Sequence, residues 1–304
     1  MTKRLAERAA IVKKVRTFFD ERGFLEVETP TLVPSPGMDL HLDAFPVDAG
    51  GRTLWLATSP EYQMKRLLAD GLSRIFQIGR AYRRGEAGVH HNPEFTMLEW
   101  YRGHAGVDDV MKDTEELVEL VSNGALVVDG RRVDCRAPFD RLRVTDAYTR
   151  FAGATEAETL RWAREDEDTF FRIYVERVEP GLASLERATF LVDYPAEMAS
   201  LARKKPSDPR FAERFELYAH GVELCNGFGE LVDPIEQRAR FDADCAARRA
   251  RGLPVYPIDE KLLDALPRMP ESGGNALGLD RLVALACGST HVGDVLAFTL
   301  EELG

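Results

Sequence analysis

The sequence predicts an α+β fold in which helices flank an antiparallel or mixed sheet. Strand-like segments follow one another through short, hairpin-like connections, and helical segments lie between these groups. The usual phosphate-binding glycine patterns, G-x-G-x-x-G and the P-loop, are absent, so a chain of this sequence that uses ATP must hold it by another device. The 304 residues contain 44% hydrophobic residues and show no linker or internal repeat. We therefore expect one domain over residues 1–304.

The expected strands share an alternation of apolar and polar residues, or a short apolar run, bounded by turn residues. They lie at residues 24–27, 53–58, 74–83, 95–101, 189–193, 211–218, 222–227 and 276–279. Residues 127–133 are expected to form a hairpin that turns at Asp129-Gly130. Between the first two strands, the Pro and Gly content of residues 33–37 predicts a loop.

The expected helices share apolar residues at three- and four-residue spacing. They cover residues 3–22, 108–122, 234–252 and 280–286 and most of 144–182, and a further helix begins at Ser59-Pro60. Gly23 follows the first helix as its C′ residue. Ser59 is expected as an N-cap, with Pro60 at the first helical position.

Composition excludes several classes of protein. The formal net charge is −11 and no long basic run is present, which argues against a large tRNA interface. The four cysteines show no C-x-x-C spacing, so a zinc site or disulfide framework is not expected and a reducing cytoplasm is. No apolar run approaches the roughly 20 residues of a membrane span, and the N-terminus lacks the features of a secretory signal. We therefore expect no membrane partner.

Arg83 and Phe95 are candidate nucleotide-binding residues. Arg83 lies at the end of one expected strand, where its guanidinium could bind a phosphate in a forked geometry. Phe95 lies on the opposing strand, and a phenyl ring can stack on a purine base. Glu99 and Tyr101 share one face of that second strand, because side chains alternate. Taken alone, an ordinary charged hairpin is the more frequent explanation of this pattern.

Two further segments carry groups suited to phosphate chemistry. Glu223 and Glu230 flank a turn-like Asn226 segment, and two carboxylates could hold Mg²⁺ there. Gly278 and Arg281 lie at a strand-to-helix junction, where glycine lets a ligand approach and arginine could reach a phosphate. Solvated strand-edge carboxylates and a weak helix-surface salt bridge are the competing explanations.

In combination, these segments resemble the signature motifs of class II aminoacyl-tRNA synthetases, most closely the lysyl subgroup. Gly23–Pro30 resembles motif 1, which that family uses for dimerisation. Tyr82–Glu99 resembles motif 2, with the lysyl-type sequence HNPEFT at His91–Thr96. Gly278–Arg281 resembles motif 3, and Thr58–Leu68 resembles the lysyl-type amino-acid pocket.

Within this group the chain is most similar to the elongation factor P lysine ligases, a family of shortened lysyl-tRNA synthetase homologues. Motif 1 begins at Gly23 with no anticodon-binding barrel ahead of it. Asn92–Arg102 has the Glu-Trp-Tyr ending of the ligases, and Ala276 stands where lysyl synthetases have glycine. The resemblance implies a homodimer that uses ATP and Mg²⁺, does not act on tRNA, and attaches (R)-β-lysine, or lysine, to a lysine side chain of elongation factor P.

The resemblance also implies which residues bind each substrate. The residues expected at ATP are Arg83, Arg84, Gly85, Glu86, His91, Asn92, Phe95, Glu223, Leu224, Gly278 and Arg281. The residues expected at the amino acid are Ser59, Pro60, Glu61, Tyr101, Asn226, Glu230 and Ala276. Arg83 and Arg281 would be catalytic, and Glu223 and Glu230 would hold Mg²⁺. Glu230 therefore has two candidate roles, at the metal and at the substrate amine, whereas His90 is expected to be a solvated loop histidine.

One departure from the family pattern keeps other functions open. Motif 2 of lysyl synthetases has Arg-Asn-Glu, whereas this chain has Arg84 in place of Asn and its glutamate, Glu86, one position later. The alternatives are an α-lysine adenylate-forming synthetase paralogue with another acceptor, and a non-catalytic regulatory protein. The presence of Arg83 and Arg281 argues against the second.

Overall fold

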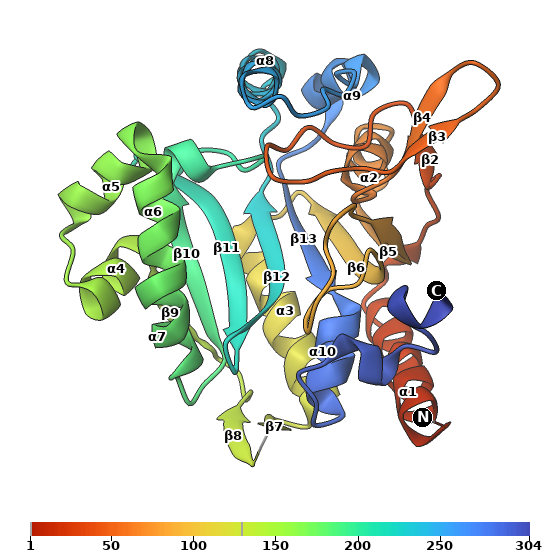
Figure 1. Cartoon of the computed structure of the whole chain (residues 1–304), viewed down its shortest axis with the longest axis vertical. Helices are drawn as coiled ribbons and strands as arrows, with labels where there is room; N and C mark the ends of the chain where they lie inside the picture. The colour runs from red at the N-terminus through yellow and green to blue at the C-terminus, as the bar shows by residue number, and fades with distance from the viewer. Residues whose placement is uncertain (1, 129) are drawn as a thin grey trace.

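The structure of the chain is a computed structural model that describes residues 2–128 and 130–304. The strands are β1 (Leu25–Glu26), β2 (Leu32–Val33), β3 (Pro46–Asp48), β4 (Thr53–Leu56), β5 (Arg74–Tyr82), β6 (Glu94–Gly103), β7 (Ala125–Val128), β8 (Arg131–Asp134), β9 (Asp140–Arg143), β10 (Thr189–Pro195), β11 (Phe211–Ala219), β12 (Val222–Gly229) and β13 (Ser272–Gly278). Eight of them form one sheet in the order β1-β5-β6-β13-β12-β11-β10-β9 (Figure 1). The two edge pairs are parallel and the inner pairs are antiparallel, so the prediction of a mixed sheet is confirmed.

Helices lie on both faces of this sheet. The α-helices are α1 (Thr2–Asp20), α2 (Glu61–Ala69), α3 (Val107–Ser122), α4 (Val144–Ala152), α5 (Glu156–Glu165), α6 (Glu167–Ile173), α7 (Glu179–Ala183), α8 (Pro234–Ala250), α9 (Glu260–Ala265) and α10 (Leu279–Ala286). A π-helical turn, η1 (Tyr174–Val178), joins α6 to α7, and the 3₁₀ turns are η2 (Ala196–Met198), η3 (Leu266–Arg268), η4 (Val292–Val295) and η5 (Glu301–Leu303). Among the described residues, no helix is both long enough and apolar enough to span a membrane.

The elements with strong periodicity lie where the sequence predicts them. The short strands β2, β3 and β9 and the helix α9 were not predicted. The N-cap prediction was wrong by one residue, because Pro60 is the N-cap of α2. The Ser59 hydroxyl instead accepts the N–H of Glu61 at 3.1 Å. Asp129 of the predicted hairpin turn lies outside the described residues, and β7 and β8 on either side of it do pair.

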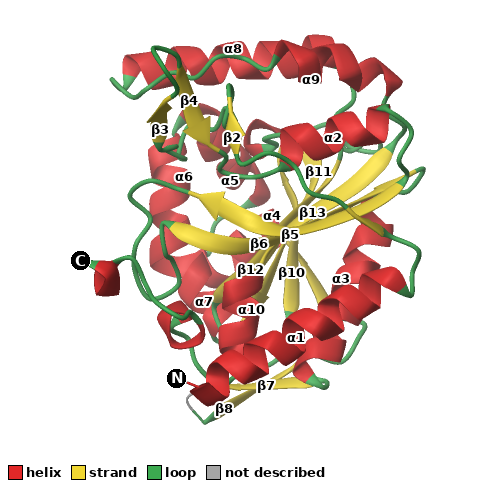
Figure 2. Cartoon of the chain, turned by 90° about the vertical axis from the view of Figure 1, so that its right-hand side faces the viewer, coloured by secondary structure: helices red, strands yellow, loops and turns green. Residues whose placement is uncertain are grey.

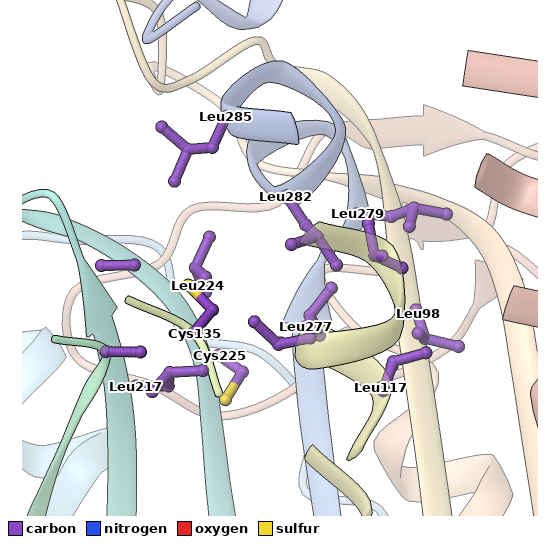
Figure 3. Close-up of a cluster of buried hydrophobic side chains, with 14 of the residues drawn as sticks. Leu98, Leu117, Cys135, Leu217, Leu224, Cys225, Leu277, Leu279, Leu282 and Leu285 are labelled. Atoms are coloured by element: carbon purple, nitrogen blue, oxygen red, sulfur yellow. The ribbon is translucent and has the colours of Figure 1, made fainter. Parts of the chain in front are cut away.

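Strand alternation divides the sheet into an apolar face and a polar face. Even-numbered residues of β6, such as Leu98 and Trp100, and Leu277 of β13 are fully buried against α1, α3 and α10. Figure 3 shows leucines from β6, β12, β13 and α10 meeting in this core. The odd-numbered residues of β6 and Ala276 of β13 face the other way, which leaves the second face of the sheet available for a site.

The second face is covered by two smaller cores. α2, α8 and α9 pack together over the β5–β6–β13 region, with Phe241 of α8 and Leu262 of α9 buried. Figure 2 shows these helices on the opposite side of the sheet from α1 and α3. The helices α4 to α7 pack against β10 and β11, with Phe170 of α6 buried. The space left between these two cores is the candidate site.

Candidate active site

A cavity of about 510 Å³ lies on the polar face of the sheet. Side chains of β6, β11, β12 and β13 line its floor, and α6, α8 and the loop at residues 38–42 close its sides. The predicted site residues that line it are Arg83, Glu86, His91, Asn92, Phe95, Glu223, Leu224, Asn226, Ala276, Gly278 and Arg281. His90, expected to be a solvated loop histidine, lines it as well and pairs through its Nδ1 with the carbonyl oxygen of Thr290 at 2.9 Å. The chain therefore brings most of the predicted nucleotide residues to one cavity.

Arg281 lines this cavity and is held there by three contacts. Its guanidinium donates to the carbonyl oxygens of His90 at 3.1 Å and Glu223 at 2.9 Å, and Nη2 lies 2.6 Å from Nε2 of His91. Burial and the neighbouring Arg281 lower the pKa of His91 to about 4, so this imidazole is neutral at pH 7 and can accept from Arg281. The guanidinium is thus pre-oriented for a phosphate group.

Arg83 and Phe95 meet as the sequence predicts. The Arg83 guanidinium lies 5.2 Å from the centroid of the Phe95 ring and donates to the carbonyl oxygen of Thr58 at 3.4 Å. Glu86 lies 3.8 Å from Arg83 and lines the cavity, although its position in motif 2 is one residue late. The displaced glutamate therefore still reaches the site.

Arg84 and Gly85 do not line the cavity. The Arg84 side chain lies 3.5 Å from the carboxylate of Asp43. The backbone N–H of Arg84 donates to the carbonyl oxygen of Asp43 at 2.7 Å. Arg248, whose side chain is fully buried, also binds the Asp43 carboxylate, at 2.6 Å. Gly85 has φ +87°, a conformation that favours glycine. These contacts tie the motif 2 turn to Asp43, directly after the loop at residues 38–42 that closes one side of the cavity.

Gly278 lines the cavity and also makes room for Arg281. A Cβ atom at this position would lie 3.3 Å from Cδ of Arg281, so the missing side chain leaves room for Arg281 itself. Gly278 is also the N-cap of α10. The carboxylate of Asp280, two residues further along the chain, accepts the backbone N–H of Thr96 at 2.8 Å and forms an ion pair with Arg8 at 2.6 Å. The glycine therefore helps to place the arginine at the cavity.

The structure does not bring the predicted metal pair together, because Glu223 lies near the start of β12 and Glu230 directly follows its end. Seven residues at about 3.3 Å each separate them by about 23 Å. Glu223 lines the cavity beside Arg281, at 3.6 Å, whereas Glu230 binds Lys65 elsewhere. The structure instead places Glu216 of β11 near Glu223. Burial and the charge of Glu216 raise the pKa of Glu223, and both carboxylates line the cavity.

This carboxylate pair fits a metal only together with other ligands. In residues 2–128 and 130–304, no group of three His, Cys, Asp or Glu side chains is arranged to hold a metal ion. Mg²⁺ commonly binds one or two carboxylates and completes its coordination with water and substrate phosphates. Glu223 matches that pattern, whereas both oxygens of Glu216 already accept hydrogen bonds, from Arg214 at 2.7 Å and from Tyr218 at 2.7 Å. A sequence signal for Glu216 exists, since Arg214, Glu216 and Tyr218 alternate with the apolar residues Phe215, Leu217 and Ala219 along this strand.

Five predicted amino-acid residues form a second cluster, next to the cavity floor. Ser59, Pro60, Glu61, Tyr101 and Glu230 do not line the large cavity. They surround Glu99, which was not among the predicted binding residues and which pairs in register with Ala276. The Glu99 carboxylate accepts hydrogen bonds from Ser59 Oγ at 2.8 Å and Tyr101 Oη at 2.6 Å.

Glu99 is a buried carboxylate without an ion-pair partner among the residues that the structure describes. Burial and the nearby charge of Glu61 raise the pKa of Glu99 to about 8, although its two hydrogen bonds oppose the shift. Such a group is unfavourable in the free protein and becomes favourable when a cation binds beside it. The cluster is therefore suited to an ammonium group.

Lys65 binds the other two carboxylates of this cluster. Its ammonium group lies 2.6 Å from Glu61 and 2.6 Å from Glu230, and its side chain is 1% exposed. Burial would lower the pKa of Lys65, but Glu230 and Glu61 raise it. Gly274 makes room here, since a Cβ atom would lie 2.3 Å from both Glu230 and Tyr101. With three carboxylates and one lysine, the cluster has a deficit of cationic charge.

We expect Lys65→Met to lower the free energy of unfolding by about 3–5 kcal/mol, because it leaves two buried carboxylates without their cation. Urea denaturation at pH 8 measures this. Lys3→Met is the matched control: Lys3 also pairs with a glutamate four residues later, Glu7, but at 3.8 Å and on the surface. That control should change the free energy by less than about 0.5 kcal/mol. A similar small change in both variants would contradict the role given to Lys65.

Comparison with known proteins places the chain in a family. The family model described as tRNA synthetases class II (D, K and N) matches residues 1–302. A protein of Enterobacter sp. (strain 638), named elongation factor P–(R)-beta-lysine ligase, is 44% identical over 310 residues, which cover 98% of this chain and 95% of that protein. Proteins of the same name from Salmonella paratyphi B and Salmonella schwarzengrund are 42% identical over 322 residues, with the same shares covered.

Proposed function

Because this chain belongs to the class II tRNA synthetases (D, K and N), we propose that it is an ATP-dependent ligase that activates (R)-β-lysine as its adenylate and transfers it to a lysine side chain of elongation factor P. The observation that carries the proposal is the pairing of two arginines at a large cavity with a buried, cation-deficient carboxylate cluster beside its floor. The names of the relatives support the choice of substrate and acceptor.

The proposed reaction has two steps. A carboxylate oxygen of the diamino acid attacks the α-phosphorus of ATP, and the bond to pyrophosphate breaks. The acceptor amine then attacks the carbonyl carbon of the adenylate, AMP leaves with the bonding electrons, and the amine loses a proton. Arg83 would neutralise charge at the α-phosphate and Arg281 would bind the terminal phosphates, which is the kind of stabilisation this chemistry needs. Phe95 would stack on adenine.

Mg²⁺ would be held by Glu223 together with phosphate oxygens and water, and would neutralise phosphate charge when bound. At the other substrate, Glu99 and Tyr101 would bind one ammonium group of the diamino acid. Glu61 and Glu230, oriented by Lys65, would face the other. Ala276 and Asn226 line the cavity between the two sites and would contact the carbon chain. The methyl group of Ala276 supports a β-amino acid, because it occupies space at the floor.

We also propose a cytoplasmic homodimer that does not act on tRNA. All four cysteines are free, which supports a reducing compartment. The formal charge of −11 supports a protein rather than a nucleic-acid acceptor. The motif 1 segment, Gly23–Pro30, would contribute to the contact between the two subunits.

ATP–pyrophosphate exchange with the purified protein tests the proposed function. We expect the highest kcat/KM with (R)-β-lysine, compared with (S)-β-lysine and L-α-lysine. Exchange with L-α-lysine alone would favour a lysyl-adenylate-forming synthetase paralogue with another acceptor. A folded protein that supports no exchange with any of the three would favour a non-catalytic regulatory protein.

A further inference from the structure

Part of the cavity is lined by residues that have no role in the binding proposed above for the nucleotide and the diamino acid. It is lined by the loop at residues 38–42, by α6 and η2, and by one face of α8. Figure 1 shows these segments around the same end of β11 and β12. We call this region the acidic end, because it contains Asp39, Glu167, Glu197 and Asp244.

Three of these four carboxylates have no ion-pair partner in the part of the chain that the structure describes. They are Asp39, Glu197 and Asp244, whereas Glu167 pairs with Arg251 at 3.1 Å and lies 3.7 Å from His41. Arg214, which also lines the cavity, pairs with Glu216 at 2.7 Å and donates to the carbonyl oxygen of Met198 at 2.6 Å. Burial, and then the charge of Asp39, raise the pKa of Asp244 to about 6, so these carboxylates lie close enough to repel one another. The acidic end therefore favours the approach of a cation, whereas Arg83 and Arg281 in the same cavity favour phosphate.

Gln237 provides a second and independent indication of a ligand. It is 1% exposed and lines the cavity, and its Nε2 has no hydrogen-bond partner among the described residues. Gln237, Phe241 and Asp244 lie four and three residues apart, so they share one face of α8. Buried amide groups are almost always hydrogen-bonded, so a free donor beside carboxylates indicates a missing acceptor such as a peptide carbonyl.

An aromatic side chain at the same end adds an apolar surface. Phe171 of α6 lines the cavity, is 38% exposed, and lies 5.5 Å from the ring of His41. An exposed phenyl ring beside carboxylates can cover the methylene groups of a lysine and attract its ammonium group. A cationic peptide segment therefore matches the acidic end better than a small anion or a nucleotide does.

We propose that the acidic end is the docking surface for a basic, lysine-bearing loop of the acceptor protein. Asp39, Glu197 and Asp244 attract the loop, Gln237 donates to a carbonyl of its backbone, and Phe171 packs on the stem of the lysine. The acceptor nitrogen then enters the cavity from the acidic end. There it forms an amide bond with the carbonyl carbon of the adenylate, AMP is released, and the proton goes to water. The inference rests on the proposed function, of which it specifies the second step.

Two half-reactions measured on the same full-length variants test this proposal. The first is ATP–pyrophosphate exchange with (R)-β-lysine, and the second is the mass increase of purified elongation factor P. We expect the triple variant Asp39→Asn, Glu197→Gln, Asp244→Asn to lower kcat/KM for the acceptor by at least about tenfold, mainly through KM. Exchange should stay within about twofold. The difference in kcat/KM for the acceptor between the wild type and the triple variant should shrink at high salt, because screening weakens the attraction between the wild-type carboxylates and the acceptor.

Two further variants make the test specific. Gln237→Met, which removes the amide donor and keeps the size, should lower transfer but not exchange. Asp242→Asn is the matched control, since Asp242 lies on the same helix as Asp244, is exposed and does not line the cavity. It should change neither half-reaction. Thermal unfolding of each variant shows that the comparison is made on folded protein.

The outcomes separate the proposal from the proposed function. Unchanged transfer in the triple variant would overturn the docking surface while leaving the function intact. A higher KM for (R)-β-lysine in exchange would also overturn it, because the carboxylates would then bind the small substrate. A wild-type protein without exchange would count against the proposed function itself, and the docking proposal would fall with it.

Discussion

Arg281→Ala should lower kcat of ATP–pyrophosphate exchange by about 10²–10³-fold. Removing one pre-oriented donor that stabilises developing charge has an effect of this size, and the three contacts of Arg281 fix its guanidinium before substrate binds. Arg281→Lys should recover only part of the activity, because a lysine supplies one point charge and no fork. Initial rates at saturating ATP measure both variants.

The control for this prediction is Arg80→Ala. Arg80 is another arginine near motif 2, but it is about half exposed, pairs with Glu94 at 3.5 Å and does not line the cavity. Its loss should change kcat by less than about twofold, since exposed ion pairs contribute little. The assignment of Arg281 to phosphate would be wrong if folded Arg281→Ala kept more than about a tenth of the activity.

Glu99→Gln should raise KM for the diamino acid by about 100-fold, because it removes the carboxylate that binds a buried ammonium group. The wild type should also bind the diamino acid more tightly as the pH rises from 6 to 8. The pKa of Glu99 is about 8 in the free protein, so below that pH the carboxyl is mostly protonated and does not attract a cation. The substrate ammonium groups stay charged over this range.

We expect KM for the diamino acid to fall on the order of tenfold for each pH unit. Burial raises the pKa of Glu230 to about 7, so the ionisation of Glu230 adds to this pH dependence below pH 7. KM for ATP over the same range is the control. In Glu99→Gln, KM for the diamino acid should lose most of its pH dependence above pH 7. The variant should also be at least as stable as the wild type at pH 8, because the ionised Glu99 is buried without a cation. A flat KM from pH 6 to 8 would show that Glu99 does not bind the substrate amine.

Local sequence patterns predicted the fold well where a segment is long and its burial follows one period. The segments that became β5, β6, α3 and α8 each repeat apolar residues over nine residues or more, as the structure confirms. β9 and α9 are short, at four and six residues, and their positions depend on neighbours that the sequence places far away. β9, for example, exists because it pairs in parallel with β10.

The candidate site was predictable to the extent that its residues belong to contiguous motifs. Arg83, Phe95 and Arg281 reach one cavity as expected. The carboxylates were harder to assign, because their partners lie on other strands or helices. Glu230 was grouped with Glu223 by proximity in sequence, whereas the length of β12 separates them and Lys65 of α2 binds Glu230. The register of β11 against β12, which a single sequence does not show, pairs Glu216 with Asn226 and Glu223 with Tyr218, so that both carboxylates line one cavity.

The position of β13 has a consequence for folding during synthesis. It is the last strand of the chain, yet it pairs with β6 on one side and β12 on the other, at the middle of the sheet. A ribosome-bound chain that ends before Ser272 can therefore build two half-sheets, each with an unpaired inner strand, but no continuous floor for the cavity. Such edges are prone to pair with other chains until they are covered. The final thirty or so residues thus complete the cavity and close the two exposed edges in one event, so a prematurely terminated chain would be both inactive and prone to aggregate.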